Sequence, residues 1–179
     1  MKYFSTYLVV TFLAGILTAC EKNSIEPLPE ESLSEFYVHA QQNGKNWLER
    51  GSAAYHKTQQ IFSISAGTPS STEKYTSLYL QFSMPKERFD ALVKSTPAQI
   101  QNPEALWLQT ENEDIVTDSF RSDSLNVPTI EIIRIDTVEK VVEGRFQATL
   151  QRDSHFTKKV ELKRFEKGTF RVRYKEFTI

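Results

Sequence analysis

The run GTFRVRYK, residues 168–175, alternates apolar and cationic side chains with a period of two. Successive side chains of a β-strand point to opposite faces of its sheet, so this period indicates a strand with one buried and one solvated face. The apolar side chains, which we expect to be buried, are Phe170, Val172 and Tyr174. The cationic side chains on the opposite face, which we call the cationic ridge, are Arg171, Arg173 and Lys175.

Alternation of the same kind recurs along the chain and predicts further half-buried strands. Their apolar positions are Phe36, Val38 and Ala40; Phe62, Ile64 and Ala66; Leu78, Leu80, Phe82 and Met84; Gly144, Phe146, Ala148 and Leu150; and Val160 and Leu162. The first run leads into Asn43-Gly44, a dipeptide typical of a type I′ hairpin turn because both central residues need positive φ. We therefore expect a mainly β fold, an antiparallel sandwich or open barrel, that ends in an antiparallel meander.

One segment has helical rather than strand periodicity. Pro85 suits the first position of a helix because its fixed φ is already helical. Phe89, Leu92 and Val93 follow at helical spacing, and Pro97 lies just beyond them. These features predict one short helix near residues 85–94.

Two segments are harder to interpret. Residues 102–125 are mixed and acidic, and apart from a strand candidate at residues 106–108 we expect a long loop there, which we call the acidic loop. Residues 129–136 are apolar, but Ile130 and Ile132 share one strand face while Ile133 and Ile135 share the other. Such a change of phase indicates a β-bulge or a strand that is buried on both faces.

The amino-terminal residues predict export and lipidation. Lys2 precedes an apolar run of eleven residues, 7–17, which is shorter than the about twenty residues that a membrane-spanning helix needs. The run ends in Leu17-Thr18-Ala19-Cys20, which resembles the lipobox of bacterial lipoproteins, where the thiol receives a diacylglyceryl group. The alternative is an ordinary signal peptide with a chance cysteine near its cleavage site. Two or three acyl chains, such as palmitate, hold a protein stably at a membrane, so lipid on Cys20 would be a sufficient anchor.

These features divide the chain into a signal peptide at residues 1–19, an acidic tether at 20–35 and a single β-rich domain at 36–179. Loss of Lys2 with the signal would change the net charge from −1 to −2, which does not favour binding to nucleic acid. Cys20 is the only cysteine, so the domain has no disulfide framework. We expect a lipid anchor in the outer membrane, and the sequence leaves the periplasmic and the cell-surface face open.

Several short motifs carry a resemblance to a known family. They are Phe36-Tyr37-Val38-His39-Ala40, Asn43-Gly44-Lys45-Asn46-Trp47, Ile133-Arg134-Ile135-Asp136, Gly144-Arg145-Phe146 and Gly168-Thr169-Phe170-Arg171-Val172-Arg173-Tyr174. With them the chain resembles a family of uncharacterised Bacteroidota lipoproteins over about half of its mature length. It departs from that family at the helix-like insert from Pro85, in the acidic loop and at residues 162–167. The resemblance implies a β-rich extracytoplasmic lipoprotein of unknown function, and it carries over no catalytic or binding residue.

No residue pattern indicates catalysis, a metal site or a cofactor. His39, His56 and His155 each lack a second histidine or cysteine at ligand spacing, and His39 lies on the polar face of its strand, where we expect it to be exposed. The chain has no Gly-x-Ser-x-Gly motif and no glycine-rich phosphate loop. The densest carboxylates are Glu111, Glu113 and Asp114. They lack the regular spacing and the turn glycine of a calcium loop, so we expect a solvated acidic loop.

Charge is distributed unevenly, with a net +5 over residues 151–179 and −5 over residues 102–125. The cationic ridge could bind an acidic glycan or a lipid phosphate; alternatively it keeps an outer strand soluble or pairs with the acidic loop. We expect a non-enzymatic binding or structural module, whose partners are the membrane and either an anionic glycan or another envelope protein. An envelope glycan hydrolase would need two carboxylates across a cleft. A subunit of an outer-membrane assembly would need an exposed apolar patch.

Overall fold

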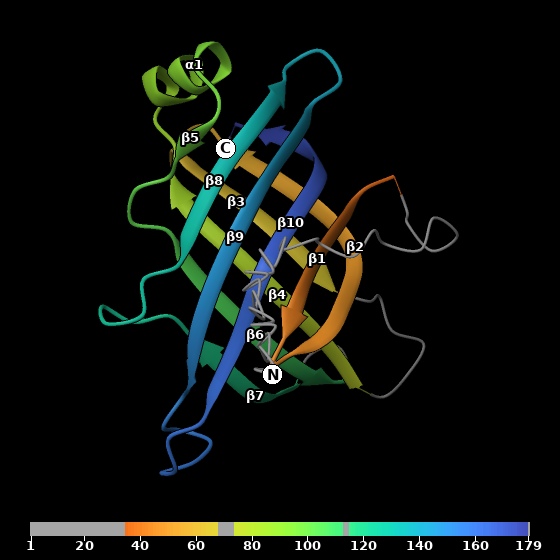
Figure 1. Ribbon diagram of the computed structural model, residues 1–179, viewed down its shortest axis with the longest axis vertical. Helices are drawn as coiled ribbons and strands as arrows, with labels where there is room; N and C mark the ends of the chain where they lie inside the picture. The colour runs from red at the N-terminus through yellow and green to blue at the C-terminus, as the bar shows by residue number, and fades with distance from the viewer. Residues whose placement is uncertain (1–34, 68–73, 113–114, 179) are drawn as a thin grey trace, which may run out of the picture.

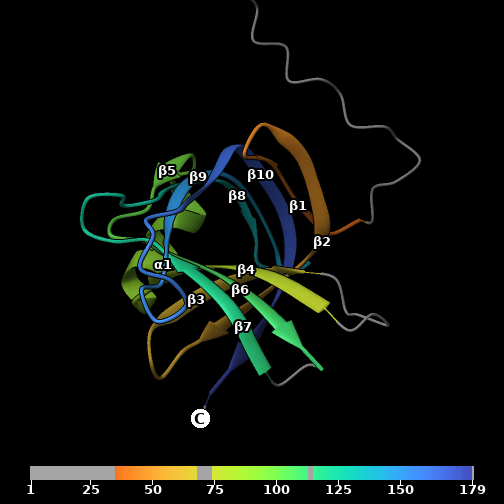
Figure 2. The ribbon, with the colours of Figure 1, turned by 90° about the horizontal axis from the view of Figure 1, so that it is seen from below.

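The computed structural model describes residues 35–67, 74–112 and 115–178 and confirms a mainly β fold. Strands make up 65% of these residues and the helix 7%. Ten strands form a single mixed sheet that rings round without forming a clear barrel (Figures 1 and 2). The arrangement follows from the alternating runs, because each strand must bury its apolar face and a curled sheet lets these faces share one core.

In chain order the elements are β1 (Tyr37–Gln42), β2 (Lys45–His56), β3 (Ile61–Gly67), β4 (Lys74–Ser83), α1 (Lys86–Lys94), β5 (Ala98–Gln99), β6 (Glu104–Glu111), β7 (Ile115–Arg121), β8 (Thr129–Asp136), β9 (Val141–Arg152) and β10 (Leu162–Phe177). The strand order is β1-β10-β2-β3-β4-β6-β7-β9-β8-β5. β10 also pairs with β9, and this additional pairing curls the sheet into a ring. The pairings are antiparallel except that residues 174–177 of β10 run parallel to residues 53–56 of β2. The expected terminal meander is β8, β9 and β10.

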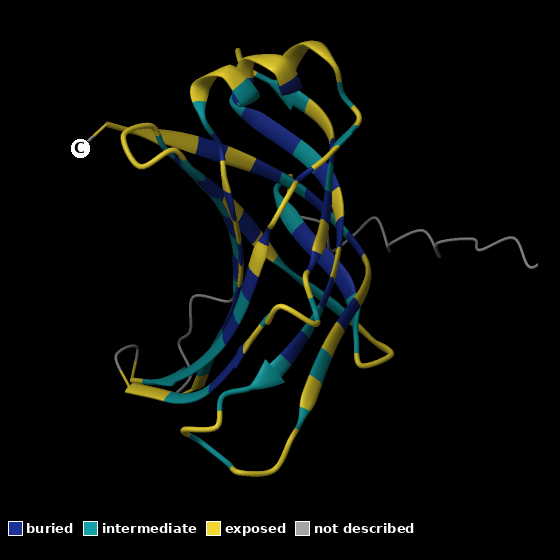
Figure 3. Ribbon diagram, turned by 90° about the vertical axis from the view of Figure 1, so that its left-hand side faces the viewer, coloured by how far each residue is buried: buried dark blue, intermediate teal, exposed yellow. Residues whose placement is uncertain are grey.

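The inner faces of the strands meet in one hydrophobic core, and buried and exposed residues alternate along the strands (Figure 3). The expected core positions that are buried are Val38, Ala40, Phe62, Ile64, Ala66, Leu78, Leu80, Phe82, Met84, Phe146, Ala148, Leu150, Phe170, Val172 and Tyr174. The Asn43-Gly44 turn is also confirmed, because these two residues join β1 to β2 with φ values of 50° and 77°.

The expectation that Val160 and Leu162 are buried is wrong. Val160 is 70% exposed and Leu162 is 39% exposed, whereas Phe165, whose burial the alternation did not predict, is fully buried. Val160 lies before β10, and the exposure of Leu162 follows from a register shift in β10 between Phe165 and Gly168. One extra residue at such a bulge reverses the phase of every side chain before it, so odd-numbered residues face the core before the bulge and even-numbered residues face it afterwards.

The change of phase expected in β8 is a bulge as well. The register of β8 against β9 shifts between Ile132 and Arg134. Ile130 and Ile132 are buried before the shift, whereas Ile133 is 36% exposed. The bulge therefore explains the apolar run without burial of both faces.

The predicted helix is confirmed as α1, which lies at one end of the ring (Figure 1). Pro85 is its N-cap residue rather than its first helical residue. Phe89 and Leu92 are buried, and the ring of Phe89 stacks on Tyr55 with centroids 5.0 Å apart. Val93, which we expected on the same face, is 37% exposed. The helix thus covers one end of the core with two side chains of its inner face.

The expectation of a long acidic loop is wrong, because most of residues 102–125 form the hairpin of β6 and β7. Its inner face is apolar, and the rings of Trp107 and Phe120 pack edge to face with centroids 5.5 Å apart. Its outer face carries half-buried Leu106 and Leu108. Apolar residues on both faces hide the alternation from a sequence pattern, which is why only residues 106–108 suggested a strand.

Candidate binding site on the terminal meander

The two Gly-x-Phe motifs of the chain pair with each other where β9 meets β10. Phe146 lies opposite Gly168, and Phe170 lies opposite Gly144. A Cβ atom added to Gly168 would lie 2.5 Å from ring atoms of Phe146, and one added to Gly144 would meet the ring of Phe170 even more closely. Each glycine therefore makes room for the phenylalanine of the other motif.

This reciprocal packing fixes what lies on the outer face of the same strands. Both rings point inward and are buried, so the middle residues of the two motifs, Arg145 and Thr169, face outward directly opposite each other. Glu131 of β8 is the next residue across from Arg145, and Thr129 of β8 lies across from Gln147. A row of polar side chains thus crosses the meander on its solvent side.

These side chains line a depression of about 630 Å³, which we call the meander depression. Its polar lining residues are Gln99, Thr129, Glu131, Arg145, Gln147, Lys167 and Thr169. Two are cationic, one is acidic and the others are neutral donors and acceptors of hydrogen bonds. The volume lies within the range of about 300–1,000 Å³ that is usual for small-molecule sites.

The cations of the meander depression are only loosely engaged. Nη1 of Arg145 lies 3.9 Å from Oε2 of Glu131, and the two side chains are 63% and 30% exposed. Lys167 makes no ion pair with any residue in the described part of the chain. Surface ion pairs as exposed as this one contribute about 0–1 kcal/mol, so both cations are free to meet an incoming anion.

Lys167 owes its place to the bulge in β10. Its φ is +51°, and among the described residues it is the only non-glycine residue inside a strand with positive φ. The left-handed region costs an ordinary side chain about 1–2 kcal/mol. A bulge can re-aim a side chain, and here it directs Lys167 to the depression that Arg145 lines.

The cationic ridge lies on the same outer face, one step along β10. Arg171 forms an ion pair with Glu143 of β9, and Nη2 of Arg173 lies 3.9 Å from Glu35. The guanidinium of Arg173 also lies over the ring of Phe36, at 4.6 Å from its centroid. Lys175 is exposed. Two of the three ridge cations are therefore partly neutralised by the protein itself.

The ridge does not pair with Glu111, as one interpretation of the sequence expected. Glu111 lies at the end of β6, which is not a neighbour of β10, and it pairs with Lys74 of β4 at 3.6 Å. Glu113 and Asp114 lie outside the described residues. The carboxylates that pair with the ridge are instead Glu143 of β9 and Glu35, which lies just before β1.

The expectation that His39 is exposed is wrong. β1 lies between β2 and β10, where Leu48 and Thr169 are the residues opposite His39, and the imidazole is 6% exposed. Nε2 of His39 pairs with Oδ1 of Asn46. His56 stacks on Phe177, and His155 contacts the edge of Phe156. Within residues 35–67, 74–112 and 115–178, no three side chains of the types His, Cys, Asp or Glu form a group that could hold a metal ion.

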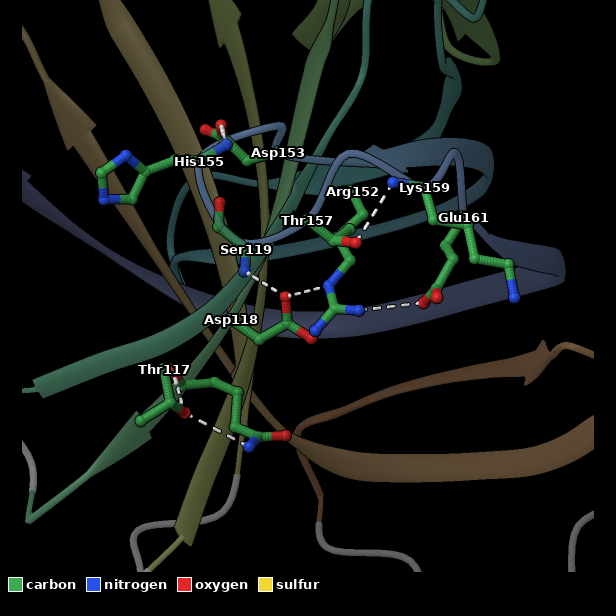
Figure 4. Close-up of polar contacts among 10 residues, drawn as sticks. Thr117, Asp118, Ser119, Arg152, Asp153, His155, Thr157, Lys159 and Glu161 are labelled. Carbon is green, nitrogen blue, oxygen red and sulfur yellow. Dashed lines mark hydrogen bonds and ion pairs between the residues drawn. The ribbon is translucent and has the colours of Figure 1, made fainter.

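A polar network links β7 to β9, which pair with each other at only two positions (Figure 4). Arg152 donates from Nε to Oδ1 of Asp118 at 2.7 Å and from Nη1 to Oε2 of Glu161 at 3.1 Å. Nearby, Nζ of Lys163 lies 3.9 Å from the centroid of the Trp107 ring, and burial lowers the pKa of this amine. β7 lies at the end of the ring opposite α1 (Figure 1), so we assign these contacts a structural role in holding that end together.

A second depression, of about 670 Å³, lies on the outer face of β3, β4 and β6 and bears on the hydrolase alternative. Glu104 and Asp123 both line it. Oδ1 of Asp123, however, accepts hydrogen bonds from the backbone N–H groups of Leu125 and Asn126, at 2.9 and 2.8 Å. These hydrogen bonds, chiefly the one from the backbone of Asn126, lower the pKa of the Asp123 carboxyl. A glycosidase acid needs a raised pKa, so Asp123 is suited to capping its turn and not to that role.

Arg145 and Lys167 were not among the site residues expected from the sequence. The signal for Arg145 was the repeated Gly-x-Phe motif, whose middle residues share a face when the motifs pair. Nothing local marks Lys167, because its position depends on the bulge. Comparison with family models, curated proteins and solved structures finds no match for this chain.

Proposed function

We propose that the chain is a lipid-anchored binding module of the cell envelope. The observation that carries this proposal is the sequence Leu17-Thr18-Ala19-Cys20 at the end of a short apolar run. Cys20 lies outside the described residues, and the first described strand, β1, begins seventeen residues later at Tyr37. The intervening acidic and proline-containing segment suits a tether between a lipid anchor and the domain.

The packing of the ring favours a binding role on its outer surface. The interior is filled by large side chains that are almost completely buried, among them Phe62, Phe165 and Tyr174. Both larger depressions are lined mainly by outward-facing residues of the strands and by the loops beside them. Partners of the module, an anionic glycan or another envelope protein, would therefore meet the outer face of the meander, where the depression and the ridge of Arg171, Arg173 and Lys175 lie together.

Lipidation is tested on the full chain expressed in a Gram-negative host. The mature protein should begin at Cys20, carry acyl chains on that residue in its mass spectrum, and partition into detergent. It should sediment with outer-membrane fractions. The described residues include no helix whose length and hydropathy would allow it to cross a membrane.

Cys20→Ala is the diagnostic variant, because it removes the acceptor thiol and leaves the apolar run intact. It should stay unprocessed or become soluble without acyl mass. A wild-type amino terminus at any other residue, or a mature protein without lipid, would reject the proposal. Protease treatment of intact cells then shows whether the domain faces the periplasm or the cell surface.

A further inference from the structure

We propose that the meander depression binds a saccharide that carries a carboxylate, with Arg145 and Lys167 holding the carboxylate. The inference rests on the proposed function and names the ligand class of that binding module. It moves the main anion contact from the cationic ridge to the depression beside it.

Charge is the first argument. Arg145 of β9 and Lys167 of β10 line the same depression, and their one acidic neighbour there is Glu131. The planar fork of an arginine fits the two oxygens of a carboxylate, while a lysine supplies a compact charge from a second direction. The loose contact of 3.9 Å between Arg145 and Glu131 can give way to a ligand at small cost.

The neutral lining indicates the rest of the ligand. Gln99 and Gln147 offer amide donors and acceptors, and Thr129 and Thr169 offer hydroxyls. Such groups bind hydroxyl groups in either direction. Glu131 is an acceptor only, so it can receive a hydroxyl of the ligand, but it would repel a second anionic group beside the first. One carboxylate among several hydroxyls is the pattern of an acidic sugar, whereas a dense polyanion fits poorly.

The backbone is the second, independent argument. Lys167 has a φ of +51° inside a strand, which an asparagine or glycine would adopt more easily. Strained residues of this kind cluster at ligand sites. The neighbouring Gly168 lies against Phe146, where an added Cβ would clash, and Lys167 at the bulge beside it lines the depression.

The test uses the full lipidated protein in a neutral detergent and measures binding by calorimetry. The probes are tetramers of galacturonate, glucuronate and mannuronate, each beside its methyl ester, which has the same hydroxyls without the charge. Inorganic phosphate and glycerol phosphate, the soluble headgroup of an anionic lipid, form separate arms. At least one uronate tetramer should bind and its ester should bind at least about tenfold more weakly, since a charge-assisted bond contributes about 1.5–3 kcal/mol.

Two matched pairs of variants locate the contact. Lys167→Asn removes the cation and suits the positive φ, and Lys175→Asn makes the same change at the exposed end of the ridge. Arg145→Gln is matched by Arg164→Gln, an exposed position on β10 outside the depression. The depression variants should weaken uronate binding about 10- to 100-fold, and the two controls should leave it within about twofold. Unchanged melting temperatures would show that both depression variants remain folded.

Four outcomes overturn the inference. They are that no uronate binds, that the esters bind equally well, that the control variants lose as much affinity as the depression variants, or that phosphate or glycerol phosphate binds in preference to the sugars. The acyl mass on Cys20 is measured on the same preparation. A lipidated protein that binds no uronate therefore rejects the ligand class alone, whereas an unlipidated protein rejects the anchored module.

Discussion

Phe146→Ala tests the reciprocal Gly-x-Phe packing that the meander depends on. Phe146 is 2% exposed, and burying a phenylalanine ring fully is worth about 1.5–3 kcal/mol. The cavity left over Gly168 adds to this loss, so the free energy of unfolding should fall by about 3–5 kcal/mol. For a domain of roughly 150 residues this corresponds to a drop in melting temperature of about 6–20 °C.

The assay is thermal unfolding of the full protein, followed by circular dichroism in the strand region. Leu162→Ala is the matched control on β10, because Leu162 is 39% exposed and should lose less than about 1 kcal/mol. An unchanged melting temperature for Phe146→Ala, or a larger loss for Leu162→Ala, would refute the assigned phase of the two strands.

The pairing itself is tested with Gly168→Ala. The added Cβ would lie 2.5 Å from two ring atoms and the carbonyl oxygen of Phe146, and overpacking of this kind costs about 1–3 kcal/mol. Phe146→Ala removes the ring atoms, so the double variant should lose less than the sum of the single variants by about 0.5–3 kcal/mol. The carbonyl contact remains, so the rescue should be partial. Strict additivity would show that the two residues do not meet.

Two further predictions concern the ring. Asp118→Ala removes the acceptor of the Nε–H bond from Arg152. Because these side chains are only 16% and 24% exposed, we expect the free energy of unfolding to fall by about 1–3 kcal/mol and hydrogen exchange in β7 and β9 to become faster. The control Asp90→Ala, in an exposed pair with Lys86, should cost less than about 1 kcal/mol, and equal losses for the two variants would contradict a structural role for the Asp118–Arg152 pair. Burial raises the pKa of Tyr174 to about 12 from 10.0, so the protonated phenol adds stability that is full below pH 10 and is lost as pH rises toward 12. Tyr174→Phe should remove that dependence, and an ultraviolet titration in which Tyr174 ionises near pH 10 would contradict it.

Much of the local structure could be predicted from the sequence. The Asn43-Gly44 turn, the inward face of Phe170, Val172 and Tyr174, and the helix after Pro85 all follow from preferences that act over a few residues: allowed φ values, a period of two and a period of 3.6. The predictions failed where a distant segment changed the outcome. Leu162 faces solvent because a bulge shifts its register against β9, and His39 is buried because β2 and β10 lie on either side of β1.

The candidate site also has one part that the sequence predicts and another that only the fold determines. The lipobox at Cys20 is a linear signal, so the residues alone are enough to propose a lipid anchor, and the alternation in β10 is enough to place Arg171, Arg173 and Lys175 on one face. No pattern in the sequence could bring Arg145 and Lys167 into one depression. Their meeting depends on the register between β9 and β10 and on the bulge beside Gly168. Side-chain alternation is a property of a single strand, whereas register is set by the fit of side chains between strands that are far apart in the chain, so the site exists only in the folded protein.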